Sequence, residues 1–246
     1  MTKEIVKEFM EKTKYKNLSE SDQRKKVPPP LLQIPYDESK TLIDLPKPDE
    51  ITVPDIDLRK AIEDRISIRK YSDEPLTLME LAWLLWSTQG IKEHTEIYSK
   101  RTVPSAGARH AFETFILVNN VETLKPGIYR YLPIEHKLIE HDLSEGIADK
   151  VVEGAYKQKM CKQGAATFIW VAVPYRIAWR YSERSYRYLH LDIGHVCQNL
   201  YLAVENIGAG TCAIAAFYDE KMNAVLGIDG EELFTIYMAS LGKKEK

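Results

Sequence analysis

Two arginines and a serine, spaced two residues apart in Arg65-Ile66-Ser67-Ile68-Arg69, form the pattern in this chain that is best suited to bind an anion. In an extended segment, side chains two positions apart point to the same side. Two guanidinium groups and a hydroxyl can then hold a phosphate through charge-assisted hydrogen bonds. Arginines that follow a helix also commonly pair with nearby acids, here Glu63 and Asp64. The segment therefore predicts either an anion site or a set of surface ion pairs.

A second segment, Pro104-Ser105-Ala106-Gly107, has side chains small enough to let the backbone approach a flat ligand closely. Glycine lacks a Cβ and also reaches conformations with positive φ, so we expect a tight turn at this position. Together, the two segments indicate a site for a flat molecule that carries a phosphate.

Three further patterns suggest chemistry, but a structural role explains each of them better. The run from Gly208 to Ala213 matches the dinucleotide-binding fingerprint, yet it follows a predicted helix, so we interpret its glycines as a helix stop and a turn. His190 and His195 flank Asp192 but lie five residues apart, off a common helix face, which argues against a metal site. The arginines and aromatics of residues 175–188 favour a lid, a rim or an inter-subunit contact over single-stranded nucleic acid.

The composition is that of an ordinary globular chain of 246 residues, 44% of them hydrophobic and 28% charged. Its net charge of -2 gives no general attraction to nucleic acid or to an anionic membrane. The N-terminus is charged and no apolar run reaches transmembrane length, so we expect no membrane partner and a cytoplasmic protein. Three scattered cysteines without a CxxC motif are interpreted as buried apolar residues: Cys161, Cys197 and Cys212.

Helical and strand patterns that do not follow a strict βαβ repeat predict an α+β fold. The predicted helices are Ile5–Met10, Leu58–Asp64, a helix capped by Thr77 and stopped by Gly90, Gly146–Gly164, and Leu189–Ile207. The predicted strands are Phe115–Val118, Gly127–Leu132, His136–Glu140, Thr167–Val173, Ala213–Phe217 and Leu233–Leu241.

We expect two parts along the chain. Residues 1–56 combine a short helix with a segment, Pro28 to Pro54, that holds seven of the twelve prolines. This segment predicts an extended arm that wraps the domain or a partner subunit, or else a loose tail. Residues 57–246 form the compact body.

The residues from Arg65 to Tyr71 follow the pattern R-x-S-x-R-x-[FY], which resembles the opening of the nitroreductase superfamily. The stretches Arg101–Arg109 and Pro126–Tyr131 are similar to the SagB-type or ThcOx-like dehydrogenase branch of that superfamily. Tyr186-Arg187-Tyr188 and Asp192–His195 extend the similarity, which covers roughly residues 12 to 242.

The resemblance implies an α+β sandwich with a central, mostly antiparallel sheet flanked by helices, and a homodimer with two flavin mononucleotides (FMN) at its interface. It implies that Arg65, Ser67 and Arg69 hold the phosphate and ribityl chain. It implies that Pro104, Ser105, Ala106 and Gly107 line the flavin from the partner chain. It places Ile214, Ala215 and Ala216 where a backbone N–H approaches flavin N5, although glycine is common at the position of Ala216. It places Lys243 or Lys244 where a cation closes on the phosphate.

The activity implied is that of an FMN-dependent oxidoreductase, working by a ping-pong cycle from NAD(P)H to a small-molecule acceptor. Because the cofactor would carry the redox chemistry, the absence of an evident acid–base pair is expected, and no catalytic side chain is assigned. The resemblance leaves two alternatives open. One is an azoline oxidase that acts on a modified peptide and passes electrons to oxygen, and the other is a flavin-binding protein without turnover.

Overall fold

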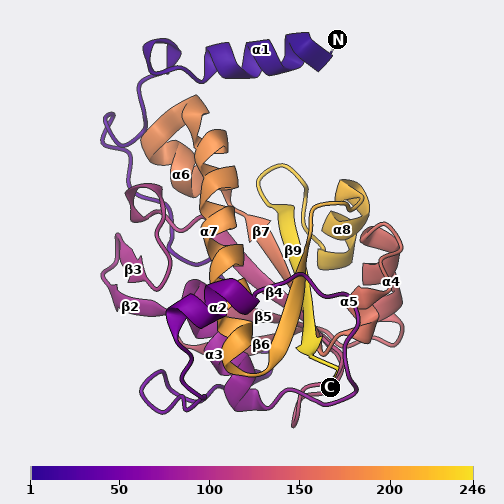
Figure 1. Ribbon diagram of the computed structural model, residues 1–246. Coiled ribbons are helices and arrows are strands. Elements are labelled where there is room, and N and C mark those ends of the chain that lie inside the picture. Colours follow the sequence, from indigo (N-terminus) through magenta and orange to yellow (C-terminus); the bar gives the residue numbers. More distant parts are fainter. Residues whose placement is uncertain (1, 246) are drawn as a thin grey trace.

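A seven-stranded sheet forms the centre of the computed structural model, which describes residues 2–245 (Figure 1). Its strands lie in the order β1-β6-β5-β4-β7-β9-β8, and every neighbouring pair is antiparallel. The strands are β1 Leu42–Asp44, β4 Phe112–Val118, β5 Gly127–Leu132, β6 Lys137–Asp142, β7 Ala166–Ala172, β8 Ala209–Ile214 and β9 Phe234–Lys243. The predicted α+β class with an antiparallel sheet is therefore confirmed.

Helices cover both faces of this sheet (Figure 1). The helices are α1 Thr2–Lys12, α2 Leu58–Asp64, α3 Leu78–Gln89, α4 Ile147–Gly154, α5 Met160–Gln163, α6 Pro174–Tyr181, α7 Ser185–Asn206 and α8 Asp219–Leu226. A small separate hairpin consists of β2 Ile91–His94 and β3 Ser99–Arg101, and single 3-10 turns are η1 Tyr15–Asn17, η2 Ala106–Ala108 and η3 Ser182–Arg184. None of the helices within residues 2–245 has the length and apolar character needed to span a bilayer.

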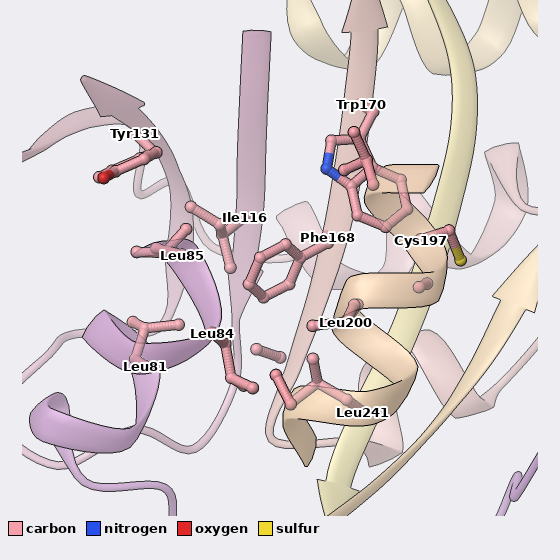
Figure 2. Close-up of a cluster of buried hydrophobic side chains, with 14 of the residues drawn as sticks. Leu81, Leu84, Leu85, Ile116, Tyr131, Phe168, Trp170, Cys197, Leu200 and Leu241 are labelled. Atoms are coloured by element: carbon pink, nitrogen blue, oxygen red, sulfur yellow. The ribbon is translucent and has the colours of Figure 1, made fainter. Parts of the chain in front are cut away.

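The central strands bury side chains on both faces, as their nearly continuous apolar runs require. In β7, Phe168 and Trp170 belong to the core under α3 and α7, whereas Ile169 and Val171 belong to the core under α4, α5 and α8. Figure 2 shows the first core, where Leu84 of α3 and other helix side chains meet Phe168. Helices therefore pack on both faces of the sheet, and the first core holds α7 against one of these faces.

Local sequence signals account for several of the element boundaries. The capping box predicted at the start of α3 is present, because Thr77 Oγ1 accepts from Glu80 N–H while the Glu80 carboxylate accepts from Thr77 N–H. Helix α2 has the predicted bounds, and α3 ends at Gly90, whose N–H donates to Trp86 O. All three cysteines are buried as predicted, and burial raises the thiol pKa of Cys161 and of Cys197 to about 12.

Two predicted elements were wrong in their extent. The single helix expected over Gly146–Gly164 is divided into α4 and α5, because Tyr156 and Lys157 take positive φ values and reverse the chain between them. The strand expected at Ala213–Phe217 is β8, which begins earlier and ends at Ile214. Gly208 does provide the turn after α7, with φ +63°.

Gly210 lies inside β8 and not in the predicted turn. A Cβ at this position would lie 2.4 Å from Ile68 Cδ1, so the missing side chain makes room for the segment that follows α2. The glycine is therefore explained by close packing between two chain segments.

The proline-rich arm lies against its own domain. Its backbone carbonyls at residues 31–35 accept hydrogen bonds from three buried arginines: Arg176 to Leu31 O, Arg101 to Leu32 O, and Arg130 to Ile34 O and Pro35 O. Farther along, β1 pairs with β6, and Leu45 enters the main core. The arm is thus held by charge and by sheet pairing along its length.

One carboxylate, Glu113 of β4, supports these arginines. It is 2% exposed, forms an ion pair with Arg176 at 2.5 Å, lies 3.6 Å from Arg130 Nε, and accepts from Ile34 N–H at 3.0 Å. A buried guanidinium without a counter-charge is costly, so this single acid stabilises several cations and the arm at once.

We expect Glu113→Gln to destabilise the protein by about 3–5 kcal/mol, because it leaves buried guanidinium groups without their counter-charge. The free energy of unfolding, measured by urea titration, tests this. Glu63→Gln removes an exposed acid paired only with Arg59 and should change the unfolding free energy little. Similar midpoints for the two variants would contradict the assigned role of Glu113.

Candidate functional site

The Arg65–Arg69 segment runs along the outer edge of β8. Arg65 ends α2, Ser67 forms a parallel bridge with Thr211, and Ile68 N–H donates to Thr211 O at 3.1 Å. Thr211 belongs to β8, the last strand of the sheet order, so the segment continues the sheet by one short extended stretch. Ile68 packs on Gly210, whereas Ile66 remains exposed.

The arginines of this segment have no acidic partner among residues 2–245. Glu63 forms its ion pair with Arg59 and Asp64 with Lys60, so both acids next to Arg65 are occupied. The Arg65 guanidinium lies 5.3 Å from the centre of the Tyr201 ring. The ion pairs considered from the sequence are therefore not formed, and two cations stay available at the β8 edge.

Tyr201 of α7 is a site residue that the sequence did not reveal. Its hydroxyl is 2.8 Å from Ser67 Oγ and accepts from Ala213 N–H at 3.0 Å. Tyr201 therefore connects the Arg65–Arg69 segment to β8 from the helix side. The only available signal was a tyrosine among the aliphatic residues of a helix, which is too common to interpret.

Ile214, Ala215 and Ala216 lie at the end of the same strand. Ile214 is buried, Ala215 and Ala216 are exposed, and Ala216 O accepts from Gln158 Nε2 at 2.9 Å. The structure thus brings these residues and the Arg65–Arg69 segment to one strand.

The two lysines at the C-terminus differ in their surroundings. Lys243 is buried, and its Nζ is bound by Glu80 Oε1 and by Ile207 O at 2.7 Å. Lys244 is half-buried, forms an ion pair with Glu205 at 2.6 Å, and lies close to Gly210. Of the two cations predicted for the phosphate, Lys244 is the one near the β8 edge.

The Pro104–Gly107 loop is positioned by α7. Ala106 N–H donates to Asp192 Oδ2 at 2.9 Å, and Ser105 Oγ accepts from His110 N–H at 2.9 Å. Burial raises the pKa of Asp192, while its hydrogen bonds to Ser105 and Ala106 oppose that shift. Asp192 thus holds the loop.

No cluster of three His, Cys, Asp or Glu side chains suited to a metal is found in residues 2–245.

Gly107 has the tight conformation expected from its type, with φ +60°. A Cβ at this position would lie 2.7 Å from Tyr181 Oη and 2.9 Å from Arg180 Cδ. Both the backbone angle and the close approach of α6 therefore require glycine.

Within one chain, α7 separates the two predicted halves of the site. Tyr201 contacts the Arg65–Arg69 segment, and Asp192 holds the Pro104–Gly107 loop. These two helix residues are nine positions apart, which is about 13–14 Å along the axis and about half a turn around it. The two segments therefore lie on opposite sides of α7.

The arginines of residues 175–188 mostly bind the N-terminal segment of the same chain. Arg184 donates to Thr13 O, Arg187 donates to Thr13 Oγ1 and Met10 O, and Arg176 belongs to the Glu113 cluster. These cations therefore hold the N-terminal segment and the Glu113 cluster within one chain. The predicted lid, rim or inter-subunit contact stays a prediction. Arg180 is the exception, since no hydrogen bond or ion pair engages it among residues 2–245.

His110, next to the loop, is expected to make stability depend on pH. Burial first, and then the nearby Arg101 cation, lower the pKa of His110 to about 3. In the unfolded state the imidazole has its ordinary pKa of about 6.5, so below that pH the unfolded state binds a proton that the native state does not. Stability should therefore fall as pH drops from about 6.5 to 5, by about 1–2 kcal/mol.

Urea titrations at pH 7 and pH 5 measure this loss. His110→Asn, which tolerates the positive φ of this position, should reduce the loss, whereas His94→Asn at an exposed position should retain it. Equal losses in wild type and His110→Asn would exclude His110 as its source.

Comparison with known proteins gives a consistent result. The family model described as "Nitroreductase family" matches residues 62–243, a range that contains both predicted site segments. The Methanocaldococcus jannaschii protein named "Putative nitroreductase MJ1384" is 33% identical over 198 residues, which is 79% of this chain and 96% of that protein.

Two further similarities cover smaller parts of longer proteins. The "Trifolitoxin-processing protein TfxB" of Rhizobium leguminosarum bv. trifolii is 27% identical over 134 residues, 53% of this chain and 36% of TfxB. A crystal structure from Anabaena variabilis, also described as a putative nitroreductase, superposes with a TM-score of 0.67 at 27% identity. That superposition covers 85% of this chain and 42% of the other. The family-model match and the MJ1384 alignment each span most of the chain, and the chain belongs to the nitroreductase family.

Proposed function

We propose that this family member is an FMN-dependent oxidoreductase that transfers reducing equivalents from NAD(P)H to a small-molecule acceptor. The observation that carries the proposal is the pair of arginines at the β8 edge, Arg65 and Arg69, which no acid of residues 2–245 engages. Arginines that lie next to a serine hydroxyl and form no ion pair with the described residues are suited to bind an anionic ligand.

The residues at the edge fit the phosphate end of FMN. Arg65 and Arg69 would supply charge-assisted hydrogen bonds, and the Ser67 hydroxyl would donate to a phosphate oxygen while its Oγ accepts from the Tyr201 hydroxyl. Lys244 lies near Gly210 and would add a further cation. When bound, FMN supplies the two-electron chemistry, and the protein positions it and shapes its electrostatic surroundings.

The flavin ring would then extend along β8 toward Ile214, Ala215 and Ala216. Ala215 and Ala216 are exposed residues after β8, and their N–H groups would face the ring edge in the arrangement expected near flavin N5. An alanine at position 216 leaves its N–H available just as a glycine would, at the cost of a methyl group near the ring.

A homodimer would complete this site. The Pro104–Gly107 loop lies across α7 from the arginines, so it can line a flavin held by the partner chain more readily than one held by its own. The exposed side of α7 offers a surface for pairing, because Leu191 is 60% exposed and Gly194 has open space where a Cβ would be.

The resemblance to SagB-type dehydrogenases supports a second candidate, an oxidase of azoline rings in a modified peptide that uses oxygen as the acceptor. The similarity to TfxB, which is named a trifolitoxin-processing protein, is in keeping with it. The same flavin site would serve either reaction. A flavin-binding protein without turnover is the outcome left if neither reaction occurs.

The double variant Arg65→Ala with Arg69→Ala should lose FMN. Each charge-assisted contact contributes about 1.5–3 kcal/mol, so together their loss weakens FMN binding on the order of 100-fold or more. The flavin content after dialysis and the dissociation constant of added FMN measure this. Arg59→Ala, on the outer side of α2, is the matched control and should bind FMN as the wild type does. Equal FMN affinity in the wild type, the double variant and Arg59→Ala would refute the assignment of Arg65 and Arg69 to the phosphate.

An anaerobic absorption spectrum separates the candidate reactions. Addition of NADH or NADPH should bleach the flavin bands, and subsequent addition of an acceptor should restore them. Flavin that stays oxidised with both donors, together with conversion of an azoline peptide to an azole under air, would establish the second candidate. A protein that takes up no FMN would refute both.

A further inference from the structure

A pocket of about 400 Å3 lies beside the Pro104–Gly107 loop, on its α6 side. It is bounded by the turn of the β2–β3 hairpin, by the end of the loop, by α6 and by the N-terminal arm. The residues that line it are Gln23, Pro29, Ile97, Tyr98, Gly107–Arg109, Trp179 and Arg180. No aspartate or glutamate is among them, whereas two arginines are.

Arg109 is the inner cation of this pocket. It is 4% exposed, donates from Nε to Arg176 O at 3.2 Å and from Nη1 to Ile97 O at 3.3 Å, and stacks 4.9 Å from the centre of the Trp179 ring. Its Nη2 is buried and has no hydrogen-bond partner within residues 2–245. Because a buried donor without a partner is costly, an acceptor from a ligand would stabilise this guanidinium.

Arg180 is the outer cation. Its side chain passes over Gly107, and its guanidinium lies 5.6 Å from the centre of the Tyr181 ring, with no ion pair to any described residue. Burial lowers the pKa of Arg109, and the charges of Arg180 and Arg176 lower it further. Arg176 is neutralised by Glu113, so Arg109 and Arg180 remain as two like charges that an anion would stabilise.

The other titratable group on the wall is already engaged. The Tyr98 hydroxyl donates to Glu93 Oε1 at 2.8 Å. Glu93 itself is not part of the pocket lining. Pro29, Ile97 and Trp179 provide apolar walls around the cations. The pocket thus combines a cationic end with apolar sides.

We propose that this pocket binds an oxyanion of one of the two substrates, a molecule with an apolar or aromatic part beside its anionic group, through Arg109 and Arg180. The assignment of the ligand as a substrate rests on the proposed function, since Gly107 belongs both to the pocket and to the loop predicted to line the flavin. The oxyanion is the carboxylate of an acceptor or a phosphate of a nicotinamide dinucleotide, and both would be recognised by the same two guanidinium groups.

Calorimetric titration of the full chain with benzoate, benzamide and inorganic phosphate tests the proposal. Arg180→Gln is the informative variant because the side chain is exposed, whereas a change at the buried Arg109 can unfold the protein. Removal of one charge-assisted contact should weaken benzoate binding about tenfold or more. Arg180→Lys, which keeps the charge, should restore most of the affinity, and Arg59→Gln should match the wild type.

Neutral benzamide should bind weakly and equally to wild type and Arg180→Gln. Benzoate binding that Arg180→Gln weakens identifies a carboxylate as the ligand, and phosphate binding that Arg180→Gln weakens identifies a dinucleotide phosphate. Phosphate binding that is unchanged in Arg180→Gln belongs to the Arg65–Arg69 segment. Affinities for both anions that are the same in wild type and Arg180→Gln, or no binding of either anion, would overturn the proposal. The FMN content of each sample is measured separately. Anion binding that depends on Arg180 in a protein that takes up no FMN would refute the flavin function and leave the anion site standing.

Discussion

The burial of Glu113 among arginines is the constraint on which most of the architecture depends. This carboxylate lies on a central strand and stabilises guanidinium groups that come from β5 and α6. Those guanidiniums in turn bind the carbonyls of the arm, whose geometry leaves them no partner in a sheet or helix. The charge cluster therefore holds the proline-rich segment in place as a wall of the domain.

The same cluster extends toward the functional loop. Arg176 accepts from Arg109 through its backbone carbonyl, and Arg109 is the inner cation of the pocket beside Gly107. Helix α7 provides the second link, since Asp192 holds the Pro104–Gly107 loop and Tyr201 holds the Arg65–Arg69 segment from opposite faces of one helix. A displacement of α7 would move both of these segments together, so a single element sets their relative geometry within one chain.

The sequence predicted the features that depend on neighbouring residues. The capping box at Thr77 and the bounds of α2 could be identified because each follows from a local spacing. The anion site at Arg65, Ser67 and Arg69 rests on the same kind of spacing and stays a prediction. The features created by tertiary packing could not be predicted. Tyr201 and Asp192 become site residues only when α7 is laid against β8 and the loop. The buried arginines were equally hidden, because arginine is usually a surface residue and its burial depends on a distant partner such as Glu113.

The position of the Arg65–Arg69 segment also bears on the association of unfolded or partly folded chains. Strand β8 is an outer strand of the sheet, and outer strands expose backbone groups that can pair with other molecules and lead to aggregation. In this protein Thr211 O is covered by Ile68 N–H, and Ala213 N–H by the Tyr201 hydroxyl. The Arg65–Arg69 segment and Tyr201 thus cover the sheet edge. Any change that loosens the segment would expose the edge of β8 to other chains.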